Sequence, residues 1–272
     1  MGEFIDRSGL IGRVSVAYCT TCAVGRSLPP LPDVQFLYAD RSSQDFQPGT
    51  SGIARIMKRL AFRRDARGLL KQVDQDPRAV IDFACGSGLF TSVLAEILGR
   101  DIQVTGTDFH RDPPKDIGQA EYRSIQDLDV LSGSADLVLA MHVLEHDDDP
   151  QTLLSRIAKL VRPGGILVIE VPNVDCIWTL VFGRFWDSWY LPYHRIHFSR
   201  NSLRRIVESS GFTVHSEHDV SLPTMGRSLA NLFGKRNGTF FIALAALLQP
   251  LQWGIERISR RPAALRIIAH RP

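Results

Sequence analysis

Apolar residues follow two alternating patterns between Arg78 and the C-terminus. Short β-branched runs predict strands, and longer segments with apolar residues three or four positions apart predict helices. The expected strands are Ala79–Phe83, Ile102–Thr107, Ala135–Ala140, Ile166–Val171, Phe212–His218 and Leu265–Ala269. The expected helices are Leu89–Leu98, Pro150–Val161, which ends before a turn at Arg162–Gly165, and Ser202–Ser210. This alternation indicates an α/β fold, in which a parallel sheet carries helices on both faces.

The pattern is weaker towards the N-terminus. Residues 1–50 contain many turn formers and predict a small irregular cap in front of a larger domain, residues 51–272. Ile53–Lys71 predicts a helix with Ile53, Ile56, Met57 and Leu60 on one face and arginines around it. The basic side of this helix is either a solvated surface or an attraction for an anionic substrate or membrane.

An apolar run, Thr239–Leu248, lies in a helical insertion, residues 225–260, before the last strand. Its length is about half of the twenty or so residues that span a bilayer. Two interpretations stay open. One is a helix buried in a lid; the other is an interfacial helix that makes peripheral membrane contact through residues 239–255.

Composition narrows the functional classes only slightly. The chain has 272 residues, 44% hydrophobic and 22% charged, as in an ordinary globular protein. A net charge of +3 is too mild to indicate nucleic-acid binding. Four cysteines do not form a disulfide framework, and the first residues lack the apolar core of a signal peptide. We therefore expect a cytoplasmic protein, with membrane association as the alternative, and no feature indicates its oligomeric state.

The most informative stretch is Val80–Gly88, in which a strand runs into the turn Ala84-Cys85-Gly86-Ser87-Gly88 and then a helix. Strand, glycine turn and helix place backbone N–H groups against a ligand. Asp82 just before the turn suits a cationic group, such as the amine of a methionine moiety. Asp108, about twenty residues after Gly88, can accept both hydroxyls of a ribose.

These residues resemble the class I S-adenosylmethionine-dependent methyltransferases of the small-molecule type, over about Arg78 to Val220. The family's first motif, D-x-G-x-G-x-G, matches Asp82-Phe83-Ala84-Cys85-Gly86-Ser87-Gly88, with Ala84 in place of a glycine. Its ribose acid matches Asp108, with Phe109 beside the adenine. Later motifs match Ala135–His146, which includes Met141 and His142, and Leu160–Ile169.

The resemblance implies a Rossmann-like, doubly wound, mostly parallel seven-stranded sheet with an antiparallel last strand. It also implies S-adenosyl-L-methionine as cofactor. The implied cofactor-binding residues are Asp82, Phe83, Ala84, Cys85, Gly86, Gly88, Asp108, Phe109, Met141 and His142. A nicotinamide oxidoreductase is disfavoured, because its G-x-G-x-x-G spacing is missing.

Two motifs resemble metal-binding patterns, but we expect neither of them to bind a metal ion. His142-Val143-Leu144-Glu145-His146 fits a zinc-peptidase pattern, but it follows a strand directly, where the resembled family carries similar letters. Cys19-Thr20-Thr21-Cys22, with Pro30, Pro32 and Tyr38 behind it, resembles the second half of a zinc ribbon found in this family. Structural zinc needs four ligands, so we expect no metal in this chain.

In the resembled family the segment Phe185–Ser199 covers the methyl-transfer site. We expect His194 or His197 to act as general base or to orient the acceptor hydroxyl, unless one of them only fixes the loop. Trp186, Trp189 and Tyr190 either line an acceptor pocket or cover the sheet edge. The acceptor is expected to be a small molecule methylated on oxygen, such as a sugar, a lipid-linked intermediate or a secondary metabolite. The alternative is a non-catalytic cofactor-binding or scaffold protein.

Overall fold

The computed structural model describes residues 3–5, 11–38, 52–235 and 238–272. At its centre lies a seven-stranded sheet in the order β10-β11-β8-β7-β4-β5-β6. The strands of this sheet are β4 (Ala79–Phe83), β5 (Gln103–Asp108), β6 (Glu121–Ser124), β7 (Ala135–Met141), β8 (Val161–Pro172), β10 (Thr213–Val220) and β11 (Ala264–His270). Only β11 runs against its neighbours, β8 and β10. The expected Rossmann-like sheet with an antiparallel last strand is therefore confirmed.

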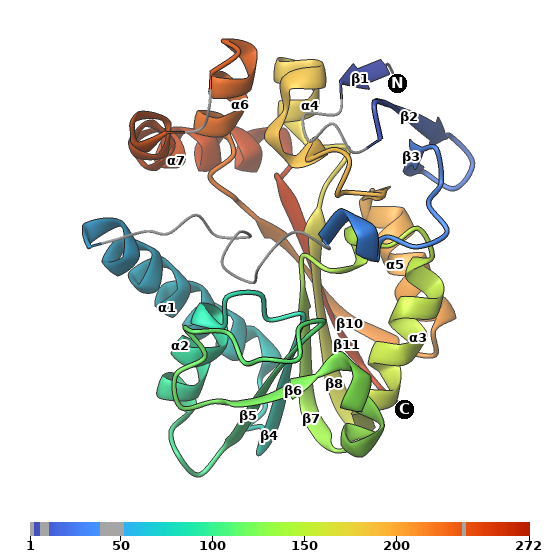
Figure 1. Ribbon diagram of the computed structural model, residues 1–272, viewed down its shortest axis with the longest axis vertical. Coiled ribbons are helices and arrows are strands. Elements are labelled where there is room, and N and C mark those ends of the chain that lie inside the picture. The colour runs from blue at the N-terminus through green and yellow to red at the C-terminus, as the bar shows by residue number, and fades with distance from the viewer. Residues whose placement is uncertain (1–2, 6–10, 39–51, 236–237) are drawn as a thin grey trace.

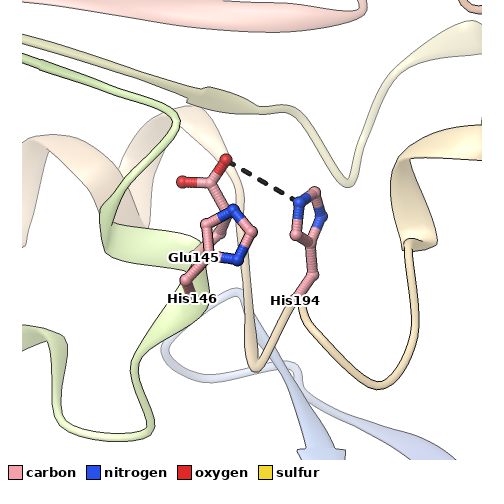
Figure 2. Close-up of side chains that lie close together, drawn as sticks. All are labelled: Glu145, His146 and His194. Atoms are coloured by element: carbon pink, nitrogen blue, oxygen red, sulfur yellow. Dashed lines mark ion pairs between the residues drawn. The ribbon is translucent and has the colours of Figure 1, made fainter. Parts of the chain in front are cut away.

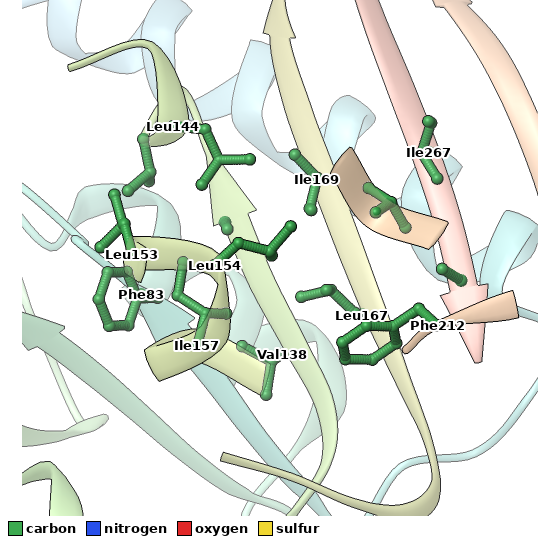
Figure 3. Close-up of a cluster of buried hydrophobic side chains, with 14 of the residues drawn as sticks. Phe83, Val138, Leu144, Leu153, Leu154, Ile157, Leu167, Ile169, Phe212 and Ile267 are labelled. Atoms are coloured by element: carbon green, nitrogen blue, oxygen red, sulfur yellow. The ribbon is translucent and has the colours of Figure 1, made fainter. Parts of the chain in front are cut away.

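Four helices cover the two faces of this sheet (Figure 1). They are α1 (Ile53–Val73) and α2 (Leu89–Leu98) on one face, and α3 (Pro150–Leu160) and α5 (Arg200–Ser209) on the other. Successive side chains of a strand point to opposite faces, so β8 supplies both cores. Leu167 and Ile169 pack with Ile157 of α3 (Figure 3), whereas Ile166 and Val168 pack under α1 and α2.

A third group of helices lies beyond the carboxyl ends of the parallel strands (Figure 1). It contains α4 (Ile177–Phe182), α6 (Met225–Leu232) and α7 (Thr239–Ser259), which we call the helical layer. The predicted apolar run is the first half of α7. Trp186 and Trp189 are buried in the core under this layer, so they pack the fold together and do not line a pocket. Among the described residues, no helix combines the length and apolar character needed to cross a bilayer.

The prediction of an irregular N-terminal cap was wrong for the part of residues 1–50 that the structure describes. β1 (Glu3–Ile5), β2 (Arg13–Cys19) and β3 (Val24–Leu28) form an antiparallel sheet with β9 (Ile196–Phe198), and residues 39–50 lie outside the described residues. In β2, Val14 and Val16 alternate inward, a pattern of only two residues that the surrounding turn formers obscured. After β3, residues Gln35–Tyr38 form a 3-10 helix, η1.

Three other details differ from the sequence prediction. The expected turn at Arg162–Gly165 is part of β8, because Gly164 and Gly165 exchange backbone hydrogen bonds with Arg271 after β11. The short strands β6 and β9 were not predicted. Four further 3-10 helices complete the chain: η2 (Ile125–Leu131), η3 (Leu144–His146), η4 (Gly183–Phe185) and η5 (Asp187–Trp189).

The apolar face predicted for the start of α1 does not face the core. Ile56, Met57 and Leu60 are exposed, whereas Ala66 and Leu69 in the second half of the helix are buried against the sheet. The helix extends past the sheet, so only its second half has something to pack on. Arg55 pairs with Asp116, and Arg59 and Arg63 pair with Glu96 of α2. These ion pairs favour the solvated-surface interpretation of the basic side.

One buried guanidinium, that of Arg195, joins three segments that are distant in sequence. Its Nε lies 2.9 Å from Oδ2 of Asp148, and one of its amino nitrogens donates to the carbonyl oxygen of Ser27 at 3.1 Å. It also donates to the carbonyl oxygens of Pro29 and Pro192. Asp148 in turn accepts the backbone N–H of Leu31 at 2.8 Å. The N-terminal sheet is thus held to the loop after β7 and to the segment before β9.

We predict that Arg195→Met lowers the free energy of unfolding by about 3–5 kcal/mol, because it removes the buried charged partner of Asp148 and leaves that carboxylate with the partly exposed Arg26, 3.4 Å away. Urea denaturation measures this difference. The matched control is Arg200→Met, since Arg200 pairs with Glu217 and Asp219 at the surface. The control should cost no more than about 1 kcal/mol. Equal losses in both variants would contradict the assigned role of Arg195.

Candidate active site

The predicted cofactor residues converge where three adjacent strands end. Asp82, Asp108 and Met141 lie at or near the carboxyl ends of β4, β5 and β7, and β4 pairs with both neighbours. The strand order reverses at β4, and such a switch point is where open α/β sheets bind ligands. A hollow of about 710 Å³, lined by residues 99–104 and 119–121, lies instead at the amino end of β5. The predicted cofactor residues therefore lie at the opposite end of the sheet from this hollow.

The glycine turn between β4 and α2 is held by backbone contacts. The Cys85 N–H donates to the Thr107 carbonyl of β5 at 2.8 Å. Gly88, with φ of 78°, caps α2. A Cβ there would lie 2.8 Å from backbone atoms of Ile117, so only glycine fits. A Cβ at Gly86 would meet no atom within 4 Å, and this side of the turn has room for a ligand.

Ala84 adopts a backbone conformation that favours glycine. Its φ is 59°, in the left-handed region, where the resembled family carries glycine. An L-residue with a Cβ costs about 1–2 kcal/mol in this region. The turn therefore keeps the family's backbone shape despite the substitution.

Two buried acids face the turn from the adjoining strands. The Thr91 hydroxyl donates to Asp82 at 2.6 Å, and burial raises the Asp82 pKa to about 7. Asp108 accepts the N–H groups of Gly86 and Phe109, each at 2.8 Å and each on a different carboxylate oxygen. Each oxygen keeps a second lone pair, so Asp108 can still accept two hydroxyls. Burial also raises the Asp108 pKa. Neither carboxylate forms an ion pair with a described residue, and such buried carboxylates suit a ligand that brings an ammonium and a ribose.

The other predicted cofactor residues have different surroundings. Phe109 is exposed beside Asp108, where a ring can stack on a base. Phe83 belongs to the hydrophobic core and Cys85 is buried, so these two can offer a ligand little beyond their backbone. Met141 packs partly against the core under α1 and α2.

His142 links the site to the interior through alternating charges. Its Nδ1 lies 3.2 Å from Oε1 of Glu145, and its Nε2 lies 3.1 Å from Oε1 of Glu170 on β8. Glu170 also binds Arg266 of β11, which reaches Asp65 of α1 at 2.8 Å. Burial opposes protonation of His142, but the two carboxylates outweigh it and raise its pKa to about 10. His142 is therefore a cation at neutral pH and holds Glu145 in place.

Glu145, His146 and His194 lie close together and form a polar cluster (Figure 2). His194 Nδ1 lies 2.8 Å from the Ser188 carbonyl oxygen, which can only accept, so Nδ1 carries the hydrogen. His194 Nε2 then has a free lone pair and lies 4.0 Å from Oε1 of Glu145. Burial and the neighbouring histidines keep the His194 pKa well below its usual range. Oε2 of Glu145 is buried and has no hydrogen-bond partner among the described residues.

His197, the second candidate base, is committed to the fold. The Ser27 hydroxyl donates to the His194 carbonyl oxygen at 2.7 Å, so it can only accept from His197 Nε2, 3.0 Å away. Burial and nearby Arg195 lower the His197 pKa to about 3. A Cβ on Gly25 would lie 2.9 Å from the Cβ of His197, so the two strands pack tightly here. His197 fixes β9 to β3.

The N-terminal region adds a residue that the sequence did not identify as part of the site. Tyr38, in η1, places its hydroxyl 2.8 Å from Nδ1 of His146. Its ring centroid lies 5.6 Å from that of Tyr193, which stacks on Tyr190 at 5.0 Å. Rings of Tyr190, His146 and His194 complete this aromatic cluster. The conspicuous tyrosine behind the Pro30-Leu31-Pro32 stretch was the available signal.

In the described part of the chain, the polar cluster of Glu145, His146 and His194 is the group that could hold a metal ion. Ligand atoms of Glu145, His146 and His194 lie within 4.8 Å of one another. Ligands bound to one zinc ion at about 2.0 Å lie about 3.3 Å apart. The cluster would have to contract, and His146 already contacts the Tyr38 hydroxyl. The absence of a required metal stays a prediction, as does the absence of zinc at Cys19 and Cys22, which lie at the ends of the β2–β3 hairpin turn.

Comparisons with known proteins agree with this geometry. A family profile described as a methyltransferase domain matches residues 53–217. A probable S-adenosylmethionine-dependent methyltransferase of Mycolicibacterium smegmatis is 26% identical over 61% of this chain and 63% of its own length. A ubiquinone biosynthesis O-methyltransferase of Coxiella burnetii is 31% identical over 38% of this chain and 47% of its own length. The chain thus spans about half to two thirds of these relatives.

Solved structures share the fold at low identity. The 1,6-didemethyltoxoflavin-N1-methyltransferase of Burkholderia thailandensis, with S-adenosylhomocysteine bound, has a TM-score of 0.54 and 18% identity, and the match covers 100% of this chain and 99% of that one. The magnesium protoporphyrin IX methyltransferase of Synechocystis, also with S-adenosylhomocysteine, has a TM-score of 0.55 and 16% identity over 88% of this chain and 100% of that one. Together with the motif order, the profile match establishes that this chain belongs to the class I S-adenosylmethionine-dependent methyltransferases.

Proposed function

We propose that this chain transfers a methyl group from S-adenosylmethionine to an oxygen of a small-molecule acceptor, with His194 as the general base. The observation that carries the proposal is the fixed tautomer of His194, a buried residue whose Nε2 lone pair faces Glu145 within a partly buried aromatic cluster. A hydroxyl acceptor must lose its proton as it attacks, and a positioned base speeds such a step by about 10²–10⁴-fold. The O-methyltransferase relative supports oxygen as the acceptor atom.

The residues of the glycine turn and the two acids would hold the cofactor. Asp82 would face the ammonium group, and Asp108 would accept the ribose hydroxyls beside Phe109. When bound, S-adenosylmethionine supplies an electrophilic methyl group on a sulfonium. The protein's contribution is then proximity, alignment and removal of one proton.

On the acceptor side, each group has a separate task. His194 Nε2 accepts the proton of the hydroxyl. Glu145, held by the His142 cation, stabilises the positive charge that develops on His194. The Tyr190 and Tyr193 rings border this position and restrict water around it. A sugar, a lipid-linked intermediate or a secondary metabolite would each present a suitable hydroxyl.

We predict that affinity for S-adenosylhomocysteine rises about tenfold from pH 6 to pH 8. The reason is that Asp82, with its pKa near 7, must be ionised to attract the ligand's ammonium, and its ionised fraction grows over this interval. Isothermal titration calorimetry measures the affinity. Asp82→Asn should bind more weakly and with a flat profile, while Asp101→Asn, an exposed change at the amino end of β5, should behave as wild type. A flat wild-type profile would remove Asp82 from the proposed role.

We predict that His194→Gln lowers turnover by about 10²–10⁴-fold without changing affinity for S-adenosylhomocysteine. Turnover is measured across a panel of hydroxylated acceptors. Because the His194 pKa lies well below its usual range, wild-type activity should persist below pH 6.5. The control, His197→Gln, should lower thermal stability more than turnover of the folded fraction. Normal turnover in both variants across pH would refute a histidine base.

The non-catalytic alternative predicts a different pair of results. A scaffold protein would bind S-adenosylhomocysteine yet turn over no acceptor in the panel. An empty fold would not bind the ligand at all.

We predict that turnover is unchanged after exhaustive treatment with EDTA, because the Glu145–His146–His194 ligand atoms are too widely spaced for a preformed zinc site. Atomic absorption on the treated protein checks that metal was removed. Activity that disappears and returns with added Zn²⁺ would instead assign an ion to this cluster.

A further inference from the structure

We propose that the outer surface of the helical layer docks on a membrane that contains anionic lipid. This surface is separate from the methyl-transfer site and serves a different purpose, namely to locate the protein at a lipid surface. Helix α7 supplies most of it, and α4 and α6 lie beside α7 (Figure 1). The argument rests on which side of α7 faces the protein, what the other side exposes, and the charges around it.

The side of α7 that faces the protein combines apolar residues, such as Ala245 and Ile255, with buried polar ones. Gln252 is fully buried and donates to Oε1 of Glu256 at 2.7 Å. Glu256 also accepts from Nε1 of Trp178 on α4, at 2.5 Å. At Gly226 of α6 an added Cβ would meet backbone atoms of α7, so the two helices are in close contact. These contacts fix the rotation of α7 about its own axis, and this rotation determines which of its residues point outward.

The side of α7 that points outward is apolar along nearly its whole length. Exposure is 69% for Phe240, 76% for Leu247, 56% for Leu251, 56% for Trp253 and 87% for Ile258. A surface helix of a globular protein normally has charged and polar residues on its outward side. Helix α7 therefore exposes apolar side chains on the side where a water-facing helix normally has polar ones.

Neighbouring helices extend the same surface. Leu180 and Val181 of α4 and Phe233 after α6 are each at least 60% exposed. Extended apolar patches on a soluble protein usually mark an interaction site. A helix that lies flat at a lipid interface buries one apolar face, and none of the described helices could cross the bilayer.

The charges around this surface select anionic lipid as the occupant. Residues 176–186 and 221–235 contain no carboxylate, and the single one in residues 238–261 is the buried Glu256. The exposed cations are Arg184, Lys235, Arg257, Arg260 and Arg261, together with Arg227, which already pairs with Asp187 at 3.6 Å. A second copy of this surface would bring like charges together, whereas anionic headgroups would pair with them. Arg257 also lies over the ring of Trp253 at 5.7 Å, at the boundary between the apolar and basic parts.

The chain carries its own probe for the experiment. Of its four tryptophans, Trp178, Trp186 and Trp189 are buried and Trp253 is exposed. We expect vesicles of phosphatidylglycerol and phosphatidylcholine to sediment the protein and to shift its tryptophan emission to shorter wavelength. Trp253→Phe should abolish the shift. Raising the salt concentration should weaken binding, because salt screens the basic residues.

Two variants and a control test the surface. Leu247→Asp with Leu251→Asp changes exposed side chains only, so the fold should survive, and vesicle partitioning should fall by about tenfold or more. Arg184→Gln with Arg257→Gln should reduce partitioning by a similar factor and weaken its salt dependence, since the other exposed cations remain. Val130→Asp, a comparable change at a 79% exposed valine on η2, should leave binding unchanged. Thermal melts confirm that each variant is folded.

Three results would overturn the proposal. One is wild-type protein that stays in the supernatant with phosphatidylglycerol vesicles at low salt. A second is partitioning that the Leu247→Asp, Leu251→Asp variant leaves unchanged. The third is a lipid-independent dimer in sedimentation velocity that this variant dissociates, because the surface would then be covered by a second copy.

Discussion

The proposed acceptor side of this protein depends on the buried guanidinium of Arg195. In the described part of the chain, this group binds carbonyl oxygens of the N-terminal segment, the carboxylate of Asp148 after β7 and the segment that carries His194. Its own N–H donates to the Glu145 carbonyl oxygen at 2.6 Å, so the same residue positions the backbone of the central carboxylate. A neutral side chain could not satisfy so many acceptors at once, and the site geometry follows from this arrangement.

The two sides of the site are built in different ways. The cofactor side is local: a turn, two strand ends and backbone hydrogen bonds to Asp108 define it within a few dozen residues. The acceptor side is assembled from distant segments, and its charges continue through His142, Glu170 and Arg266 to the helix α1 on the far face. The cofactor side can remain constant while the acceptor side varies. This arrangement matches a family whose members share a cofactor and differ in acceptor.

Sequence predicted what local pattern controls. The order of strands and helices around the main sheet and the place of Asp82 and Asp108 follow from periodicity and motif spacing. The Asp149 and Ser199 caps of α3 and α5 are equally local, since each side chain bonds a backbone N–H three residues on. What it missed depends on contacts between distant segments. The pairing of β3 with β9 and the contact of Tyr38 with His146 each span more than a hundred residues, and Arg195 and Asp148 are 47 residues apart. His194 and His197 could not be separated either, because their tautomers depend on the Ser188 carbonyl and the Ser27 hydroxyl.

The contact between Tyr38 and His146 has a consequence for where this enzyme's functional unit ends. The conserved methyltransferase profile begins at residue 53, after the N-terminal sheet and after η1. A protein trimmed to that profile would keep its nucleotide turn and lose Tyr38 from its aromatic cluster, together with the Ser27 and Pro29 partners of Arg195. If the proposed acceptor site is correct, part of its wall lies outside the recognised domain. A classification based on the sequence of that domain alone would not detect differences at Tyr38.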